Sequence, residues 1–291
     1  MPSPPPFGHY VPTVCFFDEN EELDVSAINP AFSSSKVQLH SGGVAGVIVQ
    51  GTNDKAQHLS HEECNRREKT QKLCVDAKDA GADYALILSP STFPSQMSVP
   101  SVIRFHHEVA DASPIPTMIY NFPTVTAGLD RDSDALVALA KHPNIVGAKL
   151  TCGNIAKLHR IISSVSASKI AVLAGKADFV LPGLLASSSG CITALSNLTP
   201  KLHGRLFYLW RAGKGEEAMK LQATLAHADW ALHKLGGIGG VKKVVSKAYG
   251  YGTGKVRTPL KEAMYESLLG NQHYETLMDL IRMEERLYSK L

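Results

Sequence analysis

Residues 116–149 read PTMIYNFPTVTAGLDRDSDALVALAKHPNIVGAK and carry the pattern on which the fold prediction rests. Two mostly apolar runs, 116–120 and 145–149, lie on either side of a helix-like stretch at 132–142. Continuous apolar runs are typical of parallel strands that helices cover on both faces. The stretch therefore predicts a strand–helix–strand unit whose two strands run parallel.

The same alternation of apolar runs and amphipathic stretches continues along the rest of the chain. Strands are predicted at 11–17, 45–50, 84–88, 116–120, 145–149, 170–174 and 191–194. Helices are predicted between them, at 24–40, 60–80, 101–112, 132–142, 155–165 and 178–187. Repeated strand–helix units imply a parallel sheet, which is either an open doubly wound sheet or a closed α/β barrel.

The C-terminal third reads as helices only, interrupted by the glycine-rich stretches 236–240 and 250–254. A chain of 291 residues can hold a (β/α)8 barrel, typically of roughly 250 residues, together with additional helices. We therefore predict an α/β fold with a barrel in residues 1–199. Residues 200–291 are predicted to form the last barrel helix and a C-terminal helical extension.

The predicted strands number one fewer than the eight of a complete barrel. Residues 61–72, HEECNRREKTQK, follow the second predicted strand and contain almost no apolar residue. A packed helix needs an apolar stripe, so this stretch is unusual. Two interpretations remain open: a solvent-exposed helix, or a seam near residues 65–68 from which a helix–strand–helix portion is missing.

Composition and charge exclude several classes of protein. Hydrophobic residues make up 44% of the chain and the formal net charge is +3, which indicates a well-cored globular protein. The absence of a long Lys/Arg run argues against nucleic acid as a partner. No apolar run approaches the ~20 residues of a membrane span, and the N-terminal sequence does not resemble a secretory signal.

The cysteines indicate a reducing compartment. They are scattered, odd in number and form no CxxC pair: Cys15, Cys64, Cys74, Cys152 and Cys191. Free thiols of this kind are typical of intracellular proteins. We therefore expect a cytoplasmic protein, with a mitochondrial location as the alternative.

Polar residues stand at or just past the C-terminal ends of three predicted strands: Thr52, Tyr120 and Lys149. In parallel α/β barrels this end carries the chemistry, because the loops after the strands converge there. Lys149 closes the apolar run NIVGAK, and burial there would favour the neutral amine. A neutral amine can attack a ketone and form a Schiff base. The alternative is a first loop residue whose ammonium lies in solvent.

The other two positions are weaker signals when each is taken alone. A phenol at Tyr120 could shuttle protons near an imine, but it could equally fix the proline turn that follows the strand. The backbone of Gly51-Thr52-Asn53 could hold a carboxylate, or form an ordinary turn between strand and helix.

Several other kinds of site are excluded by their missing motifs. His58 and His61 are three residues apart but have no further ligands at metal spacing, so no metal site is predicted. The chain has no GxxxxGK[ST] or GxGxxG motif for a nucleotide, and no GxSxG motif for a serine nucleophile.

Four stretches, in order along the chain, together resemble the dihydrodipicolinate synthase / N-acetylneuraminate lyase family of class I Schiff-base aldolases and lyases. The first is the GTN turn within residues 44–57, and the second is YNFP at 120–123. The third is NIVGAK at 144–149, and the fourth is GIGGVKK, GYG and RTPL within residues 236–260. The resemblance extends over nearly the whole chain and implies a (β/α)8 TIM barrel with a C-terminal helical extension.

The resemblance also implies roles for individual residues. Lys149 matches the Schiff-base lysine and Tyr120 matches the proton-relay phenol. Thr52 matches a residue that takes part in the relay, and Asn53 joins it in binding the carboxylate of the keto acid.

Three further positions are implied to bind the substrate. Thr151 matches a hydroxyl position of the hydroxyoxoglutarate aldolase branch. Gly190 and Ile192 match the backbone of the last barrel strand near the bound keto acid.

The resemblance implies a lyase that joins Lys149 to pyruvate or another 2-keto acid as a Schiff base, and then cleaves or forms a C–C bond with an aldehyde as partner. Because the imine is the electron sink, neither a metal nor an organic cofactor is expected. A homo-oligomer, either a dimer or a tetramer, is implied by the resemblance alone.

Departures from the family pattern favour one branch. Residues 124–129, TVTAGL, lack the arginine that synthases acting on aspartate semialdehyde carry after Y-N-x-P. The sequence therefore favours 4-hydroxy-2-oxoglutarate aldolase and fungal 2-keto-3-deoxy sugar acid aldolases. Dihydrodipicolinate synthase remains an alternative. A non-catalytic keto-acid-binding member is another, because Asp54-Lys55 replaces Gly-Glu and residues 89–94 contain no tyrosine.

By the same resemblance, the third barrel strand and the ends of its flanking helices are missing where the chain passes from HEEC directly to KTQK. The chain is then roughly 25 residues shorter than a complete barrel requires. The resemblance thus favours the seam over the exposed helix.

Overall fold

The computed structural model describes residues 2–24, 26–28, 42–49, 67–250, 252–258, 260–263 and 270–288. The chain forms two compact units, each built from separate segments. The first unit contains Met1–Phe7, Leu59–Gly175 and Pro182–Cys191. The second contains Gly8–His58, Lys176–Leu181 and Ile192–Leu291. The division predicted between residues 199 and 200 stays a prediction.

The first unit is built on parallel strands whose ends lie in register. Its strands are β3 (Ala85–Leu88), β4 (Thr117–Asn121), β5 (Ile145–Leu150), β6 (Ala171–Ala174) and the beginning of β7 (Gly190–Ile192). Leu88 pairs with Tyr120, Tyr120 with Lys149, and Lys149 with Leu173. The register therefore brings the C-terminal ends of four strands to one level.

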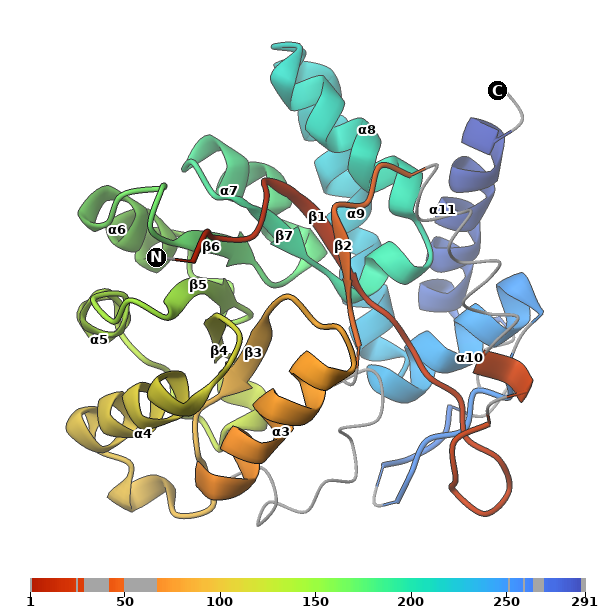
Figure 1. Ribbon diagram of the computed structural model, residues 1–291. Helices are drawn as coiled ribbons and strands as arrows, with labels where there is room; N and C mark the ends of the chain where they lie inside the picture. Colours follow the sequence, from red (N-terminus) through yellow and green to blue (C-terminus); the bar gives the residue numbers. More distant parts are fainter. Residues whose placement is uncertain are drawn as a thin grey trace. The chain divides into compact units, whose positions relative to one another are not determined.

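Helices follow the strands, and α3 packs on α4, α4 on α5, and α5 on α6 (Figure 1). They are α3 (Arg67–Asp79), α4 (Val99–Ala112), α5 (Ser133–Leu139), α6 (Ile155–Ser164) and α7 (Val180–Leu185). Polar side chains fix where three of them begin: Ser98, Asp132 and Asn154 accept hydrogen bonds from backbone N–H groups in the first turns of α4, α5 and α6. Short 3₁₀ turns at Pro94–Gln96 and Pro123–Val125 follow β3 and β4.

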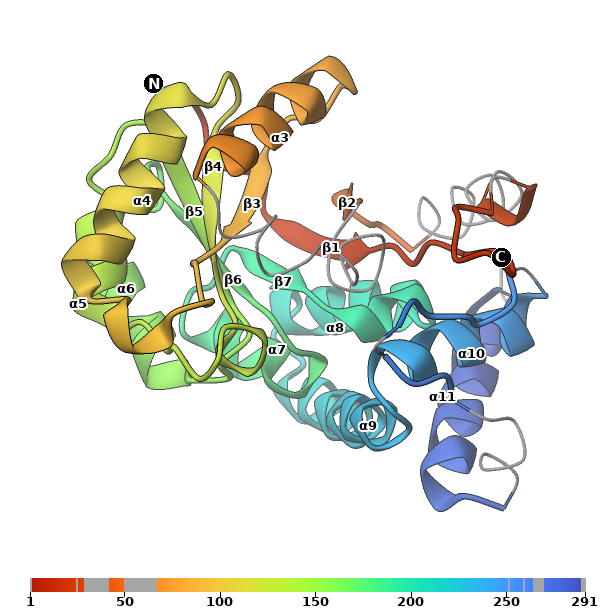
Figure 2. The same ribbon diagram turned by 90° about the horizontal axis from the view of Figure 1, so that it is seen from below.

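The second unit combines two parallel strands with the long helices. The strands are β1 (Gly8–Pro12) and β2 (Gly46–Ile48). The helices are α8 (Pro200–Arg211), α9 (Gly215–Lys234), α10 (Ile238–Tyr249) and α11 (Gln272–Tyr288), with 3₁₀ turns at Ala177–Phe179 and Ala194–Asn197. Helix α9 contacts both α8 and α11 (Figure 2). The carboxylate of Glu284 on α11 accepts the backbone N–H groups of Lys201 and Leu202, which ties α11 to the start of α8.

The prediction of a parallel α/β fold with seven strands and a C-terminal helical extension is confirmed. The strand order is β2-β1-β7-β6-β5-β4-β3, so β2 and β3 each have one partner among the described residues. The eighth strand of a barrel is absent from the described part of the chain. Residues 50–66, which connect β2 to α3 and include half of the predicted seam at 65–68, lie outside that part.

One predicted strand differs from what is observed, and one predicted helix is described in part. The first strand was expected at 11–17 but lies at Gly8–Pro12. Phe16 and Phe17 are buried without joining the parallel ladder, and Phe17 instead forms an isolated antiparallel bridge with Leu23. Helix α3 includes residues 67–72 of the apolar-poor stretch and buries only Cys74, while residues 61–66 lie outside the described residues, so the choice between an exposed helix and a seam stays a prediction.

The predicted breaks in the helical extension are also found. Glycines with positive φ separate α9 from α10, and Gly250 ends α10 in the left-handed conformation with φ 72°. A glycine adopts this conformation without the steric cost that other residues incur.

Candidate active site

Lys149 and Tyr120 form a buried pair at the C-terminal ends of neighbouring strands. The Lys149 Nζ donates a hydrogen bond to the Tyr120 hydroxyl oxygen at 2.9 Å. Lys149 is 5% exposed and Tyr120 is 7% exposed, so the interpretation of Lys149 as a solvated loop residue is wrong. Every residue of β4 and β5 is buried, and this sets the amine and the phenol in an environment that excludes most water. An amine held against a neutral partner in such a place is suited to nucleophilic attack.

Two further contacts fix the ring of Tyr120. The ring stacks on Phe122 with centroids 5.4 Å apart and an interplanar angle of 26°. The Lys149 Nζ lies 4.1 Å from the centroid of the Tyr120 ring. The phenol therefore has little freedom to turn away from the amine.

Thr151 carries a second hydroxyl just past the end of β5. It follows Lys149 by two residues, and its Oγ1 is buried with no hydrogen-bond partner among the described residues. Gly175 leaves room for this hydroxyl, because a Cβ at position 175 would lie 2.1 Å from the Thr151 Oγ1. A buried hydroxyl without a partner costs free energy, and a bound oxygen-rich ligand would recover that cost.

The remaining predicted site residues are placed only in part. Gly190 and Ile192 are buried in β7, and β6 separates this strand from β5 in the sheet order. Gly190 belongs to the first unit with Lys149, whereas Ile192 belongs to the second unit. Thr52 and Asn53 lie outside the described residues, as do His58 and His61.

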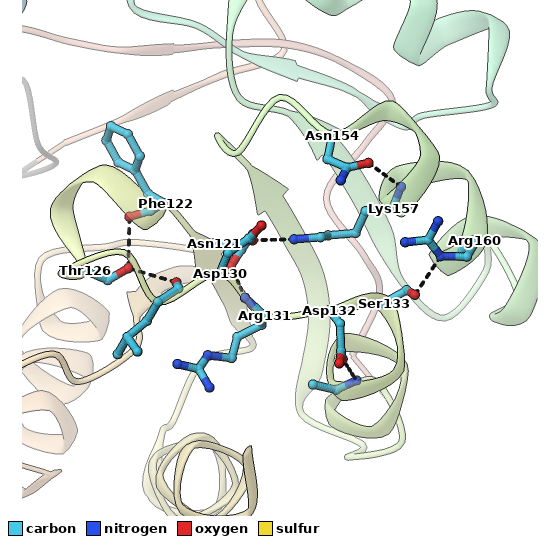
Figure 3. Close-up of polar contacts among 12 residues, drawn as sticks. Asn121, Phe122, Thr126, Asp130, Arg131, Asp132, Ser133, Asn154, Lys157 and Arg160 are labelled. Atoms are coloured by element: carbon cyan, nitrogen blue, oxygen red, sulfur yellow. Dashed lines mark hydrogen bonds and ion pairs between the residues drawn. The ribbon is translucent and has the colours of Figure 1, made fainter. Parts of the chain in front are cut away.

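Sequence reasoning missed a polar network behind the strand ends (Figure 3). The Lys157 ammonium on α6 donates a hydrogen bond to Asp130 Oδ1, and the Asn121 side-chain amide donates to the same oxygen at 2.7 Å. Burial acts to raise the pKa of Asp130, but the hydrogen bonds from Asn121 and Lys157 outweigh it and hold this pKa below its usual value. In the sequence Lys157 looks like an ordinary surface lysine of an amphipathic helix, so only the adjacency of Asn121 to Tyr120 could have pointed to the network.

A second buried pair lies behind β3. The Ser89 Oγ and the His106 Nε2 are 3.1 Å apart, and both residues are buried. Burial lowers the pKa of His106 to about 3, with smaller contributions from His107 and Arg131, so the imidazole is neutral at pH 7.

Within the described residues no group of three His, Cys, Asp or Glu side chains is arranged to hold a metal ion. None of the helices there is long and apolar enough to span a bilayer.

Two hollows in the second unit are separate from these residues. One lies beside α10 and the other between α9 and α11, and none of the predicted site residues lines either of them. The chemistry-bearing residues that the structure brings together are therefore Tyr120, Lys149 and Thr151, all in the first unit.

The structure thus defines an α/β protein of parallel strands joined by helices, with a buried lysine and tyrosine side by side at the strand ends. The model of the dihydrodipicolinate synthetase family matches residues 43–281. This chain belongs to that family, as the sequence motifs predicted.

Relatives and a solved structure agree with this family. The 4-hydroxy-2-oxoglutarate aldolase, mitochondrial, of Emericella nidulans is 40% identical, and the match covers 90% of this chain and 94% of that protein. The L-threo-3-deoxy-hexylosonate aldolase of Hypocrea jecorina is 36% identical, with 88% and 90% covered. The crystal structure of a dihydrodipicolinate synthase family protein from Coccidioides immitis superposes with a TM-score of 0.84 and 28% identity, covering 99% of both chains.

Proposed function

We propose that this chain is a class I aldolase that cleaves or forms a C–C bond through a Schiff base on Lys149. The observation that carries the proposal is the buried hydrogen bond of 2.9 Å between Lys149 Nζ and the Tyr120 hydroxyl. It joins a nucleophile to a proton-transfer group, which is the arrangement that covalent catalysis of this kind requires.

The reaction follows from the properties of these two groups. The neutral amine of Lys149 attacks the C2 ketone of a 4-hydroxy-2-keto acid, and loss of water gives a protonated imine. As the C3–C4 bond breaks, the Tyr120 oxygen accepts the proton of the C4 hydroxyl and passes its own proton through the Thr52 hydroxyl to solvent. The C3–C4 electrons form the C2–C3 double bond of an enamine, and the C=N electrons become the lone pair on nitrogen. Release of the aldehyde, protonation at C3 and hydrolysis of the imine return pyruvate and the free amine. Thr52 assists the proton transfer, and no metal or organic cofactor takes part.

The keto-acid end of the substrate is bound by residues that the sequence singled out. The unpartnered hydroxyl of Thr151 donates to the substrate, and Asn53 joins Thr52 in binding the carboxylate. The resemblance to the family supports the backbone of Gly190 and Ile192 as further contacts of the keto acid. A hydroxyl, an amide side chain and backbone groups together can satisfy a carboxylate without an arginine.

The substrate is a 4-hydroxy-2-oxoglutarate or a 2-keto-3-deoxy sugar acid. Two observations support this: the names of the relatives, and the missing arginine in residues 124–129. In the cleavage direction the second product is then glyoxylate or a sugar-derived aldehyde. The enzyme works as a homodimer or homotetramer in the cytoplasm, or in mitochondria as the name of the Emericella relative indicates for that protein.

A panel of substrates tests the proposal. The purified full chain is incubated with 4-hydroxy-2-oxoglutarate, with 2-keto-3-deoxy sugar acids, and with pyruvate plus aspartate semialdehyde. We expect pyruvate release from at least one of the first two classes and no consumption of aspartate semialdehyde. Turnover of aspartate semialdehyde would support dihydrodipicolinate synthase instead, and pyruvate binding without any turnover would indicate a non-catalytic protein.

A further inference from the structure

Lys157 is buried although it carries a charge, and this requires a reason. It lies in the first turn of α6 and its side chain is 4% exposed, whereas the side chain of its partner Asp130 is 41% exposed. Replacing a buried ion pair by apolar residues is often neutral or stabilising, so the pair is weak support for a role in stability alone.

The partners of Lys157 lead directly to the end of the strand that carries Tyr120. Asp130 Oδ1 accepts hydrogen bonds from both Lys157 Nζ and Asn121 Nδ2, and Asn121 Oδ1 accepts the backbone N–H of Arg131 at 3.1 Å. Asn121 follows Tyr120 in β4, and its backbone carbonyl accepts the N–H of Thr151 at 3.0 Å. One chain of contacts therefore links α6 to the ends of β4 and β5.

The loop of residues 122–131, which follows β4, is held closed by the side chain of Asn121. Residues 122–131 leave the strand next to the Asn121 side chain and return to it at Asp130 and Arg131 (Figure 3). Inside the loop, the Thr126 hydroxyl lies within hydrogen-bond distance of the carbonyls of Phe122 and Leu129. The ring of Phe122, which stacks on Tyr120, is part of this loop. Movement of Asn121 would therefore be transmitted to the phenol from two sides.

We propose that Lys157 is a positioning residue for the C–C bond step: through Asp130 and Asn121 it holds the Tyr120 hydroxyl in place beside Lys149. This inference rests on the proposed aldolase function. Imine formation needs the Lys149 amine and the ketone, whereas C–C cleavage also needs the phenol at the correct distance. A loss of Lys157 should thus separate the two steps.

The chain offers a matched control one turn further along α6. Arg160 donates from its Nε to the Ser133 Oγ at 2.9 Å and so attaches α6 to α5, without contacting the end of β4. The variant Lys157→Met removes the charge but keeps the length of the side chain. Since Asp130 is half exposed, water can take the place of the lost ammonium. Lys157→Arg keeps the charge, and Arg160→Met removes a cation from the same helix.

Three measurements are made on the full chain and the three variants: the rate of borohydride trapping with pyruvate, kcat and KM for the best keto-acid substrate, and hydrogen exchange of the Thr151 amide by mass spectrometry. For Lys157→Met we expect unchanged trapping, an unchanged KM, a kcat lower by a factor of about 10 to 100, and faster exchange at Thr151. Lys157→Arg should recover part of kcat, and Arg160→Met should resemble the unmodified protein in all three.

The inference is overturned if Lys157→Met keeps full kcat, or if Lys157→Met and Arg160→Met lose kcat, trapping and Thr151 protection to the same extent. If the unmodified protein neither traps pyruvate nor turns over substrate, the proposed function fails. The exchange measurement then still decides whether Lys157 holds the strand ends, because unchanged exchange at Thr151 in Lys157→Met would refute that.

Discussion

Two buried lysines lie eight residues apart and have opposite surroundings. Lys149, at the end of β5, donates to the hydroxyl oxygen of Tyr120 and has no carboxylate partner among the described residues. Lys157, at the start of α6, is paired with the carboxylate of Asp130. A carboxylate holds a lysine in an ion pair, whereas a phenol can exchange a proton beside a nucleophilic amine. The difference shows that the partner of a buried lysine, rather than its burial, decides whether it is suited to react.

The largest expected effect comes from removing the amine of Lys149. Lys149→Met should lower kcat/KM by a factor of roughly a thousand or more, because the covalent route is lost. The midpoint of urea denaturation should stay the same or rise, since an apolar side chain replaces a buried amine. A Lys149→Met protein that keeps a tenth of the activity would contradict the assignment of Lys149.

Removal of the Tyr120 hydroxyl should have a smaller and more selective effect. Tyr120→Phe keeps the ring and its stacking on Phe122 but cannot transfer a proton. We expect kcat for C–C cleavage to fall about 100-fold, within the usual range for general acid–base catalysis, while borohydride trapping of pyruvate on Lys149 continues. Equal losses in trapping and in cleavage would show that the phenol does not act in the second step.

The loss of stability should depend on which partner of the Lys157–Asp130 ion pair is removed. Asp130→Ala leaves the Lys157 ammonium buried without its partner and should lower the free energy of unfolding by about 3 kcal/mol. Lys157→Met should cost clearly less, because the half-exposed Asp130 carboxylate can be hydrated. Urea denaturation of both variants measures the difference. Equal destabilisation by the two substitutions would mean that the exposure of Asp130 does not decide the outcome.

The smallest expected effect concerns the buried imidazole of His106. Burial lowers the pKa of His106 from 6.5 to about 3, so the folded state disfavours the protonated ring that the unfolded state forms. Its contribution to stability is complete above pH 6.5 and is lost as the pH falls from 6.5 toward 3. The urea midpoint should therefore fall between pH 6.5 and pH 4.5. The fall should be shallower in His106→Gln, and an equally steep fall in this variant would contradict the assignment.

The sequence predicted the parts of the molecule that depend on local pattern. All seven strands were found, and Tyr120 and Lys149 were placed at strand ends because each closes an apolar run. The 2.9 Å pair itself depends on the register of β4 and β5, which a single sequence does not display. The first strand was predicted too far along the chain, because the buried Phe16 and Phe17 extend its apolar run without joining the parallel ladder.

The contacts of Lys157 could not be predicted for a related reason. Asp130 lies 27 residues before it, and the two meet only once β4, β5 and α6 are assembled. In the sequence, IAKLHRIISS shows an amphipathic helix in which a lysine normally points into water. The hydroxyl of Thr151 is a similar case, since its place beside Gly175 depends on how β5 and β6 pair.

The most direct test of the difference between the two lysines is borohydride reduction of the full chain in the presence of pyruvate, followed by mass analysis of its peptides. We predict a reduced pyruvate adduct on Lys149 and none on Lys157, and no adduct at all in Lys149→Met. Absence of the adduct from Lys149 in the unmodified protein, or its presence on Lys157, would contradict the assignment of Lys149 as the Schiff-base lysine.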